Sequence, residues 1–142
     1  MARVFINDKF VGDIKIAADP QSQAKGLMGV DWPPHPLLFP YKTSGVRKFW
    51  MKNTASPLDI IFCRANEVIY IGEGEPFNAE DLVGPDDNCD LVLEFPKGFV
   101  AQANVGIGSK VRVKYSKDEL LDIMKNGSPK FKESDDQDRN AT

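Results

Sequence analysis

Four polar residues, whose side chains could bind a ligand or transfer a proton, lie beside strongly apolar parts of the sequence. Lys52 and Asn53 interrupt one apolar run, Asp59 stands inside the next, and Glu94 stands in a later one. A charged side chain among core residues is costly to bury unless it is paired or hydrogen-bonded. Two interpretations account for these four residues.

The first interpretation is structural. Asn53 and Thr54 satisfy the backbone of a turn, because short polar side chains in turns commonly bond to nearby backbone. Asp59 accepts hydrogen bonds from backbone N–H groups or from Lys52. Glu94 faces outward. We favour this interpretation.

The second interpretation is a shared binding site. Lys52 and Asn53 act as donors, Asp59 and Glu94 act as acceptors, and Trp50 forms an apolar or stacking wall. Such a site suits a small polar ligand, for example a sugar, a peptide end or an anion. It predicts a non-enzymatic ligand- or protein-binding module.

A hydrolase acting on a carbohydrate-like substrate is the alternative. Asp59 and Glu94 would then work as an acid/base pair, which requires their carboxyl groups to lie about 5–10 Å apart across a cleft. We favour a protein without catalytic activity, because the sequence has no other acid/base arrangement. The one histidine, His35, stands between prolines with no neighbouring acid to orient it.

No metal or cofactor is expected. Cys63 and Cys89 lie on separate segments without CxxC spacing, and we expect both to be free, largely buried thiols. The acidic segment 86–90 lacks the spacing of a calcium-binding loop. With a single histidine there is no His/Cys cluster of the zinc type.

The amino-acid composition is typical of a single soluble domain. The chain has 142 residues, of which 42% are hydrophobic and 27% charged, with a net charge of −3. This charge disfavours nucleic acid as a general partner, although a local basic patch could form at Arg47, Lys48 and Lys52. No apolar run reaches the ~18 residues of a membrane span, and no secretory signal precedes the first strand. We expect a cytoplasmic monomer that does not bind membranes.

The hydrophobic pattern predicts short strands and two helices. An opening hairpin at 4–6 and 10–16 turns at Asn7 and Asp8, which tolerate left-handed backbone. Asp19 and Pro20 start a helix near 20–29, with Gly26 inside it. The capping box formed by Ser116 and Glu119 starts a C-terminal helix near 117–126.

The most apolar stretch, 49–62, predicts two strands around a Lys-Asn-Thr turn. Further strands are predicted at 67–72, 91–95 and 111–115, with an edge segment at 37–39 after a proline-rich run and an acidic loop at 73–90. The fold class is therefore mainly β (α+β): a compact, antiparallel sheet or partial barrel. Residues 1–126 form the single β-rich domain, and the polar residues 127–142 form a disordered tail.

The order of these segments resembles the bacterial, archaeal and phage family named domain of unknown function 192. The resemblance spans roughly residues 4–115 and rests on Phe-Trp-Met-Lys-Asn-Thr at 49–54 and Pro-Leu-Asp-Ile-Ile-Phe at 57–62, with further matches at 24–29, 93–98 and 106–108. It implies a compact β-rich fold with little helix and supplies no activity. An accessory role in a phage or its host, with the acidic tail as a tether, is a further alternative.

Overall fold

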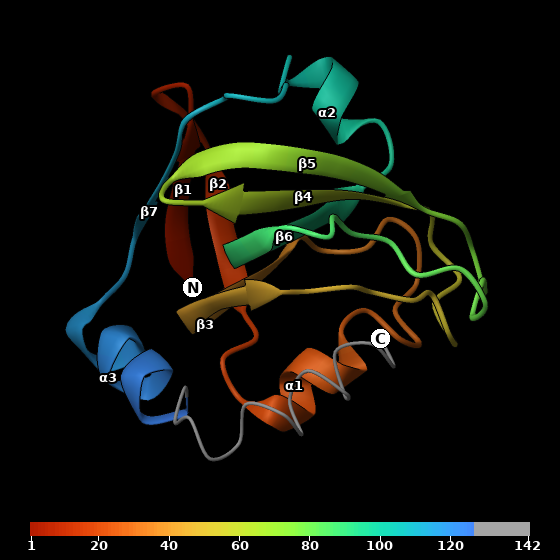
Figure 1. Cartoon of the computed structure of the whole chain (residues 1–142), viewed down its shortest axis with the longest axis horizontal. Helices are drawn as coiled ribbons and strands as arrows, with labels where there is room; N and C mark the ends of the chain where they lie inside the picture. The colour runs from red at the N-terminus through yellow and green to blue at the C-terminus, as the bar shows by residue number, and fades with distance from the viewer. Residues whose placement is uncertain (127–142) are drawn as a thin grey trace.

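The computed structural model describes residues 1–126 as one seven-stranded sheet with three short helices (Figure 1). The elements are β1 (Ala2–Ile6), β2 (Lys9–Ile16), α1 (Pro20–Lys25), β3 (Leu37–Val46), β4 (Leu58–Arg64), β5 (Glu67–Gly74), β6 (Asn88–Pro96), α2 (Phe99–Gln102), β7 (Val111–Lys114) and α3 (Lys117–Asn126). The strand order is β5-β4-β6-β3-β2-β1-β7. The predicted mainly β partial barrel, with a helix near 20–29 and a C-terminal helix, is confirmed. The predicted tail lies outside the described residues.

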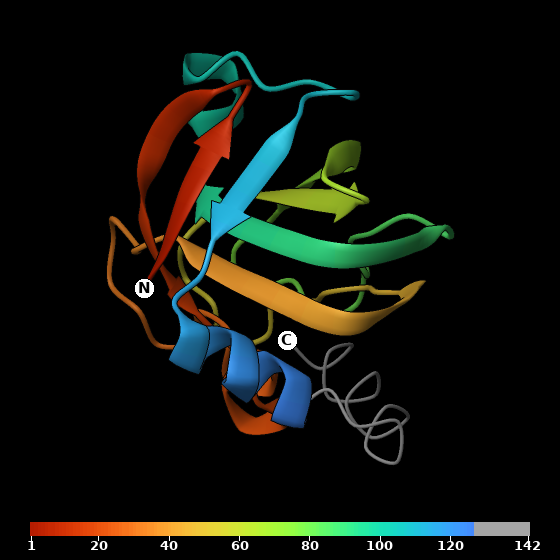
Figure 2. The same cartoon turned by 90° about the vertical axis from the view of Figure 1, so that its left-hand side faces the viewer.

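One weak pairing divides this sheet. β2 and β3 are parallel and share two residue pairs, Lys15 with Leu37 and Ile16 with Leu38, whereas all other strand pairs are antiparallel. Beyond these pairs the strands diverge, so β2, β1 and β7 cross the other four strands at an angle (Figure 2). An isolated bridge between Glu67 and Lys110 joins the far ends. The sheet therefore curls into a barrel that stays open on one side.

Two hydrophobic clusters cover the two faces of the β4–β6 pair. Ile61 and Leu93 belong to the cluster that lies between this pair and strands β1, β2 and β7. Ile60, Phe62 and Val92 belong to the cluster on the opposite face, beneath the segments that surround α1 and precede β4. Both faces of β4 are consequently buried from Leu58 to Cys63.

Local sequence signals account for the hairpin and the helix starts. Asn7 and Asp8 have positive φ angles of 50° and 66°, as the predicted turn requires. The Asp19 carboxylate caps α1 by accepting a hydrogen bond from the Ser22 N–H at 2.7 Å. Ser116 and Glu119 form both bonds of the capping box at the start of α3.

Three local predictions are wrong. The segment 37–39 is not at an edge, because it begins β3, which lies between β6 and β2 inside the sheet. Gly26 is not inside a helix: α1 ends at Lys25, and Gly26 is its C-cap with a φ of 51°, a conformation that L side chains disfavour. The first half of the stretch 49–62 is not a strand. Its backbone pairs with an irregular loop, through Phe49 with Val83 and through the Met51 N–H donating to the Asn78 carbonyl at 2.7 Å.

Candidate functional site

The buried Asp59 carboxylate holds a backbone turn. Asp59 is 5% exposed, and its Oδ2 accepts hydrogen bonds from the N–H groups of Gly98 and Val100, both at 3.0 Å. Gly98 has a φ of 103°, and it starts the short helix α2. Asp59 therefore fixes the connection between β6 and α2, as the structural interpretation expects of a backbone-bound carboxylate.

Asp59 and Glu94 lie on opposite faces of the sheet. Glu94 pairs directly with Ile60 on β4, and directly paired residues share a face. Asp59 is the neighbour of Ile60 along the strand, so its side chain projects to the other face. The two carboxylates therefore cannot meet across one glycosidic bond. Glu94 is also 1% exposed, so the expectation that it faces outward is wrong, because β6 is a central strand covered on both sides.

Trp50, Lys52 and Asn53 do lie together, at a surface hollow of about 340 Å³ that also includes Ala24, Lys25 and Met28. We call this the Trp50 hollow. The Lys52 ammonium lies 5.2 Å from the centre of a Trp50 ring. Asn53 has a φ of 56°, and its carbonyl accepts the Gly29 N–H at 3.0 Å. The structure thus brings together three of the five predicted site residues, and it places Asp59 and Glu94 elsewhere.

The proposed basic patch at residues 47, 48 and 52 does not form. Arg47 is 3% exposed, its guanidinium lies 4.1 Å from the centre of the Tyr41 ring, and it donates to the Thr43 carbonyl. Lys48 forms an ion pair with Asp86 at 2.6 Å. The buried Arg47 and the exposed Val46 reverse the burial that side-chain polarity alone predicts.

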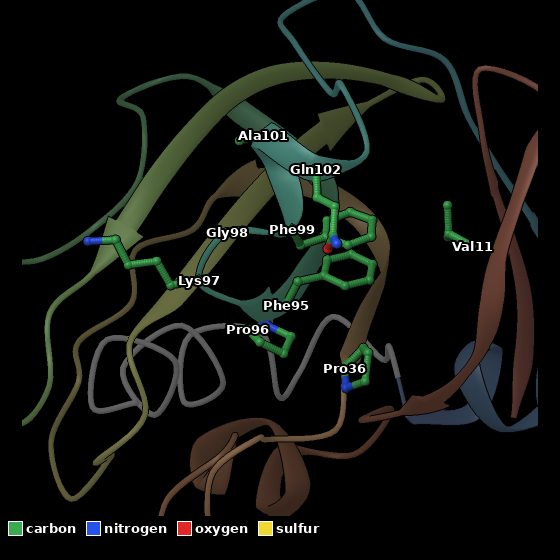
Figure 3. A pocket seen from close by; sticks show the side chains of 9 residues that line it. All are labelled: Val11, Pro36, Phe95, Pro96, Lys97, Gly98, Phe99, Ala101 and Gln102. Atoms are coloured by element: carbon green, nitrogen blue, oxygen red, sulfur yellow. The ribbon is translucent and has the colours of Figure 1, made fainter.

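A second cavity, of about 750 Å³, opens where β2 and β3 diverge. It is lined by Val11, Pro36, Phe95, Pro96, Lys97, Gly98, Phe99, Ala101 and Gln102. We call this the split-sheet cavity. The rings of Phe95 and Phe99 stack with their centres 3.6 Å apart and a 4° angle between their planes. In Figure 3 the Gln102 side chain reaches these rings, Val11 stands across from them, and the Lys97 ammonium points away.

Asp59 does not line this cavity, but it stabilises the backbone of one of its walls. Gly98, one of the two residues whose N–H groups it binds, lines the cavity, and Phe95 is the direct strand partner of Asp59. The apolar pattern predicts only that a strand ends at Phe95. Two phenylalanines flanking a Pro-Lys-Gly turn were the available signal, but their stacking depends on the turn geometry that Asp59 fixes.

His35 and Cys63 lack the surroundings that activate a base or a nucleophile. His35 is exposed, and its Nδ1 lies 3.0 Å from the carbonyl oxygen of Pro36. Burial raises the pKa of the Cys63 thiol, and the charges of Asp90 and Cys89 raise it further, so the reactive thiolate is disfavoured. Residues 1–126 contain no group of three or more His, Cys, Asp or Glu side chains able to hold a metal ion. No helix in this range is long and apolar enough to cross a membrane.

Comparison with known proteins places this architecture in a family. A crystal structure from Sinorhizobium meliloti 1021, provisionally described as a transcription regulator, is 26% identical, covers 79% of this chain and 91% of its own, and superposes with a TM-score of 0.67. A protein of unknown function from Novosphingobium aromaticivorans DSM 12444 is 29% identical over 70% of this chain and 72% of its own, with a TM-score of 0.61. No curated protein matches the sequence. The family model DUF192, described as "Uncharacterized ACR, COG1430", matches residues 3–113, and the chain therefore belongs to the DUF192 family.

Proposed function

We propose that this protein is a non-enzymatic binding module that holds a small, uncharged ring compound in the split-sheet cavity. The observation that carries this proposal is the stacked pair of Phe95 and Phe99 at a cavity of about 750 Å³. Small-molecule sites are typically concave and apolar, and in β-rich folds they often lie at the mouth of a barrel. The split-sheet cavity lies between the diverging strands β2 and β3, and most of its lining is apolar.

The chemistry of the walls defines the ligand. Apolar side chains, proline and phenylalanine among them, form most of the lining, and they suit a flat apolar ring. Gln102 supplies one amide, which can donate and accept a hydrogen bond. Lys97, the one charged residue of the lining, points its ammonium away from the rings (Figure 3). A ligand with one polar group and no charge therefore fits best.

The first test is binding of 1-naphthol, measured by isothermal titration calorimetry. We expect the wild type to bind it, and we expect Phe99→Ala to weaken binding about tenfold, because an aromatic pair contributes roughly 0.5–1.5 kcal/mol beyond its buried area. Gln102→Leu should reduce the preference for 1-naphthol over naphthalene, because the amide partner of the hydroxyl is lost.

Phe77→Ala is the matched control for Phe99→Ala. Phe77 is 64% exposed and lies on the loop after β5, outside the cavity lining. Its removal should leave 1-naphthol binding unchanged. Equal losses in the two alanine variants, or no binding by the wild type, would show that the cavity is not a ring-binding site.

The Trp50 hollow supports a second candidate function, the binding of a small organic anion. Lys25 and Lys52 both border the hollow, and neither has an ion-pair partner among residues 1–126. The Trp50 indole and the Met28 side chain offer an apolar surface beside these two charges. A carboxylate with an apolar body would place its charge at the lysines and its body against the indole.

Trp50 itself can report this binding. In a Trp32→Phe background, Trp50 is the remaining tryptophan, so its fluorescence should change as benzoate is added. We expect Lys25→Gln and Lys52→Gln each to weaken benzoate binding about threefold, as removal of one exposed charge typically does. Lys42→Gln, which changes an exposed lysine outside the hollow, is the control. If uncharged benzyl alcohol changes the fluorescence as strongly as benzoate does, the hollow does not recognise anions.

A further inference from the structure

Cations and aromatic rings alternate on the outer face of the β2-β1-β7 group. The side chains are Arg3 and Phe5 on β1, Phe10 on β2, and Arg112 and Lys114 on β7, and we call them the basic–aromatic face. The strand register brings them together, because Phe5 pairs with both Phe10 and Arg112, and Arg3 pairs with Lys114. Figure 2 shows these three strands side by side.

The distances describe one continuous surface. The centres of the Phe5 and Phe10 rings are 5.4 Å apart. The guanidinium of Arg112 lies 4.2 Å from the Phe5 ring centre, and that of Arg3 lies 5.1 Å from the Phe10 ring centre. Lys114 places its ammonium 5.6 Å from the Phe5 ring centre. Phe10 is 50% exposed, so one ring is still open to a stacking partner.

The charge of this face is locally positive. Arg112 and Lys114 have no ion-pair partner among residues 1–126. Arg3 has one acidic neighbour, Asp13, at 3.9 Å, and both side chains are more than half exposed. The interaction energy of an exposed ion pair at this distance is small, so Arg3 remains able to bind another anion. Three cations and one carboxylate therefore surround the two rings.

We propose that the basic–aromatic face binds single-stranded nucleic acid. A base stacks on Phe10, and the phosphates beside it pair with Arg112, Lys114 and Arg3. Sheet surfaces that bind single strands combine these two features, exposed aromatic rings for the bases and cations for the backbone. Cations alone would suit an acidic protein, and exposed rings alone would suit an apolar ligand. The two features together favour a nucleic acid strand.

The net charge of the chain does not oppose this proposal. Phosphate binding depends on the cations that contact the strand, so a local cluster can bind although the chain as a whole carries a net charge of −3. Because the chain as a whole is acidic, we expect only a short stretch of the nucleic acid to contact the protein, at this face. Such a short contact predicts moderate affinity with a strong dependence on salt.

The test is fluorescence anisotropy with fluorescein-labelled oligouridine at several salt concentrations, with the full-length chain. We expect Phe10→Leu to weaken binding about fivefold or more, because it keeps an apolar side chain but removes the stacking surface. We expect Arg112→Gln to weaken binding and to reduce the slope of log affinity against log salt by about 0.7. Two matched controls, Phe77→Leu and Arg64→Gln, change the same residue types at exposed positions away from this face and should bind as the wild type does.

Heparin and lipid vesicles separate this partner from other polyanions. Arg112→Gln should also weaken heparin binding, whereas Phe10→Leu should not, because heparin has no bases to stack. The proposal is overturned if Phe10→Leu binds oligouridine as the wild type does. It is equally overturned if the wild type binds phosphatidylserine vesicles and not the oligonucleotide.

Discussion

Asp59→Ala is expected to lower the free energy of unfolding by about 3 kcal/mol, because it leaves two partly buried N–H groups without their charged acceptor. The N–H groups of Gly98 and Val100 then lose bonds that fix the start of α2. Urea denaturation followed by circular dichroism measures the change. The midpoint should fall while the dependence on urea concentration stays the same, since the same surface is exposed on unfolding.

Asp59→Asn and Asp31→Ala are the controls for this variant. Asparagine keeps one acceptor oxygen in nearly the same place, so we expect a loss of about 1–2 kcal/mol. Asp31 is exposed, and its removal should change the unfolding free energy by less than about 0.5 kcal/mol. A loss below about 1 kcal/mol for Asp59→Ala would show that the two hydrogen bonds contribute little.

The same variant tests the link between Asp59 and the split-sheet cavity. Its side chain does not line the cavity, but it holds the backbone of Gly98, which does. Asp59→Ala should therefore weaken 1-naphthol binding under conditions where the protein stays folded. If binding is unchanged, the cavity does not depend on this support, and the ring-binding proposal rests on the Phe95–Phe99 stack alone.

Local signals in the sequence were sufficient to predict the elements with specific end residues. The hairpin at Asn7 and Asp8, the Asp19 cap of α1 and the capping box of α3 each depend on a few adjacent residues. Alternation of apolar residues likewise predicted most of the strands. The position of Gly26 is predicted wrongly, because the sequence does not show whether the helix continues past this glycine or ends at it as a C-cap.

The candidate site could not be assembled in the same way. Whether Asp59 and Glu94 share a face depends on the register between β4 and β6, and a shift of one residue would reverse the answer. No local pattern sets that register. The split-sheet cavity and the basic–aromatic face depend on register and on strand divergence too, so neither was predicted. Trp50, Lys52 and Asn53 were found together because they are neighbours along one short segment.

The apolar half of the stretch 49–62 also matters for stability. Phe62 is fully buried, and its ring meets those of Phe49 and Tyr70 edge to face, with centres 5.6 Å apart in both pairs. It thus joins β4 to the irregular segment before it and to β5. Phe62→Ala is expected to lower the free energy of unfolding by about 4 kcal/mol, because it removes buried apolar area and leaves a cavity that its neighbours fill only partly.

Phe62→Leu and Tyr70→Ala show whether this loss comes from packing at position 62. Leucine retains most of the buried volume, so it should lose less than half as much stability as alanine does. Tyr70 contacts the same ring but is 37% exposed on the edge strand β5, and its truncation should cost about 1 kcal/mol. Urea denaturation of the three variants gives the comparison. If Phe62→Ala and Tyr70→Ala lose equal stability, the loss does not come from packing at position 62.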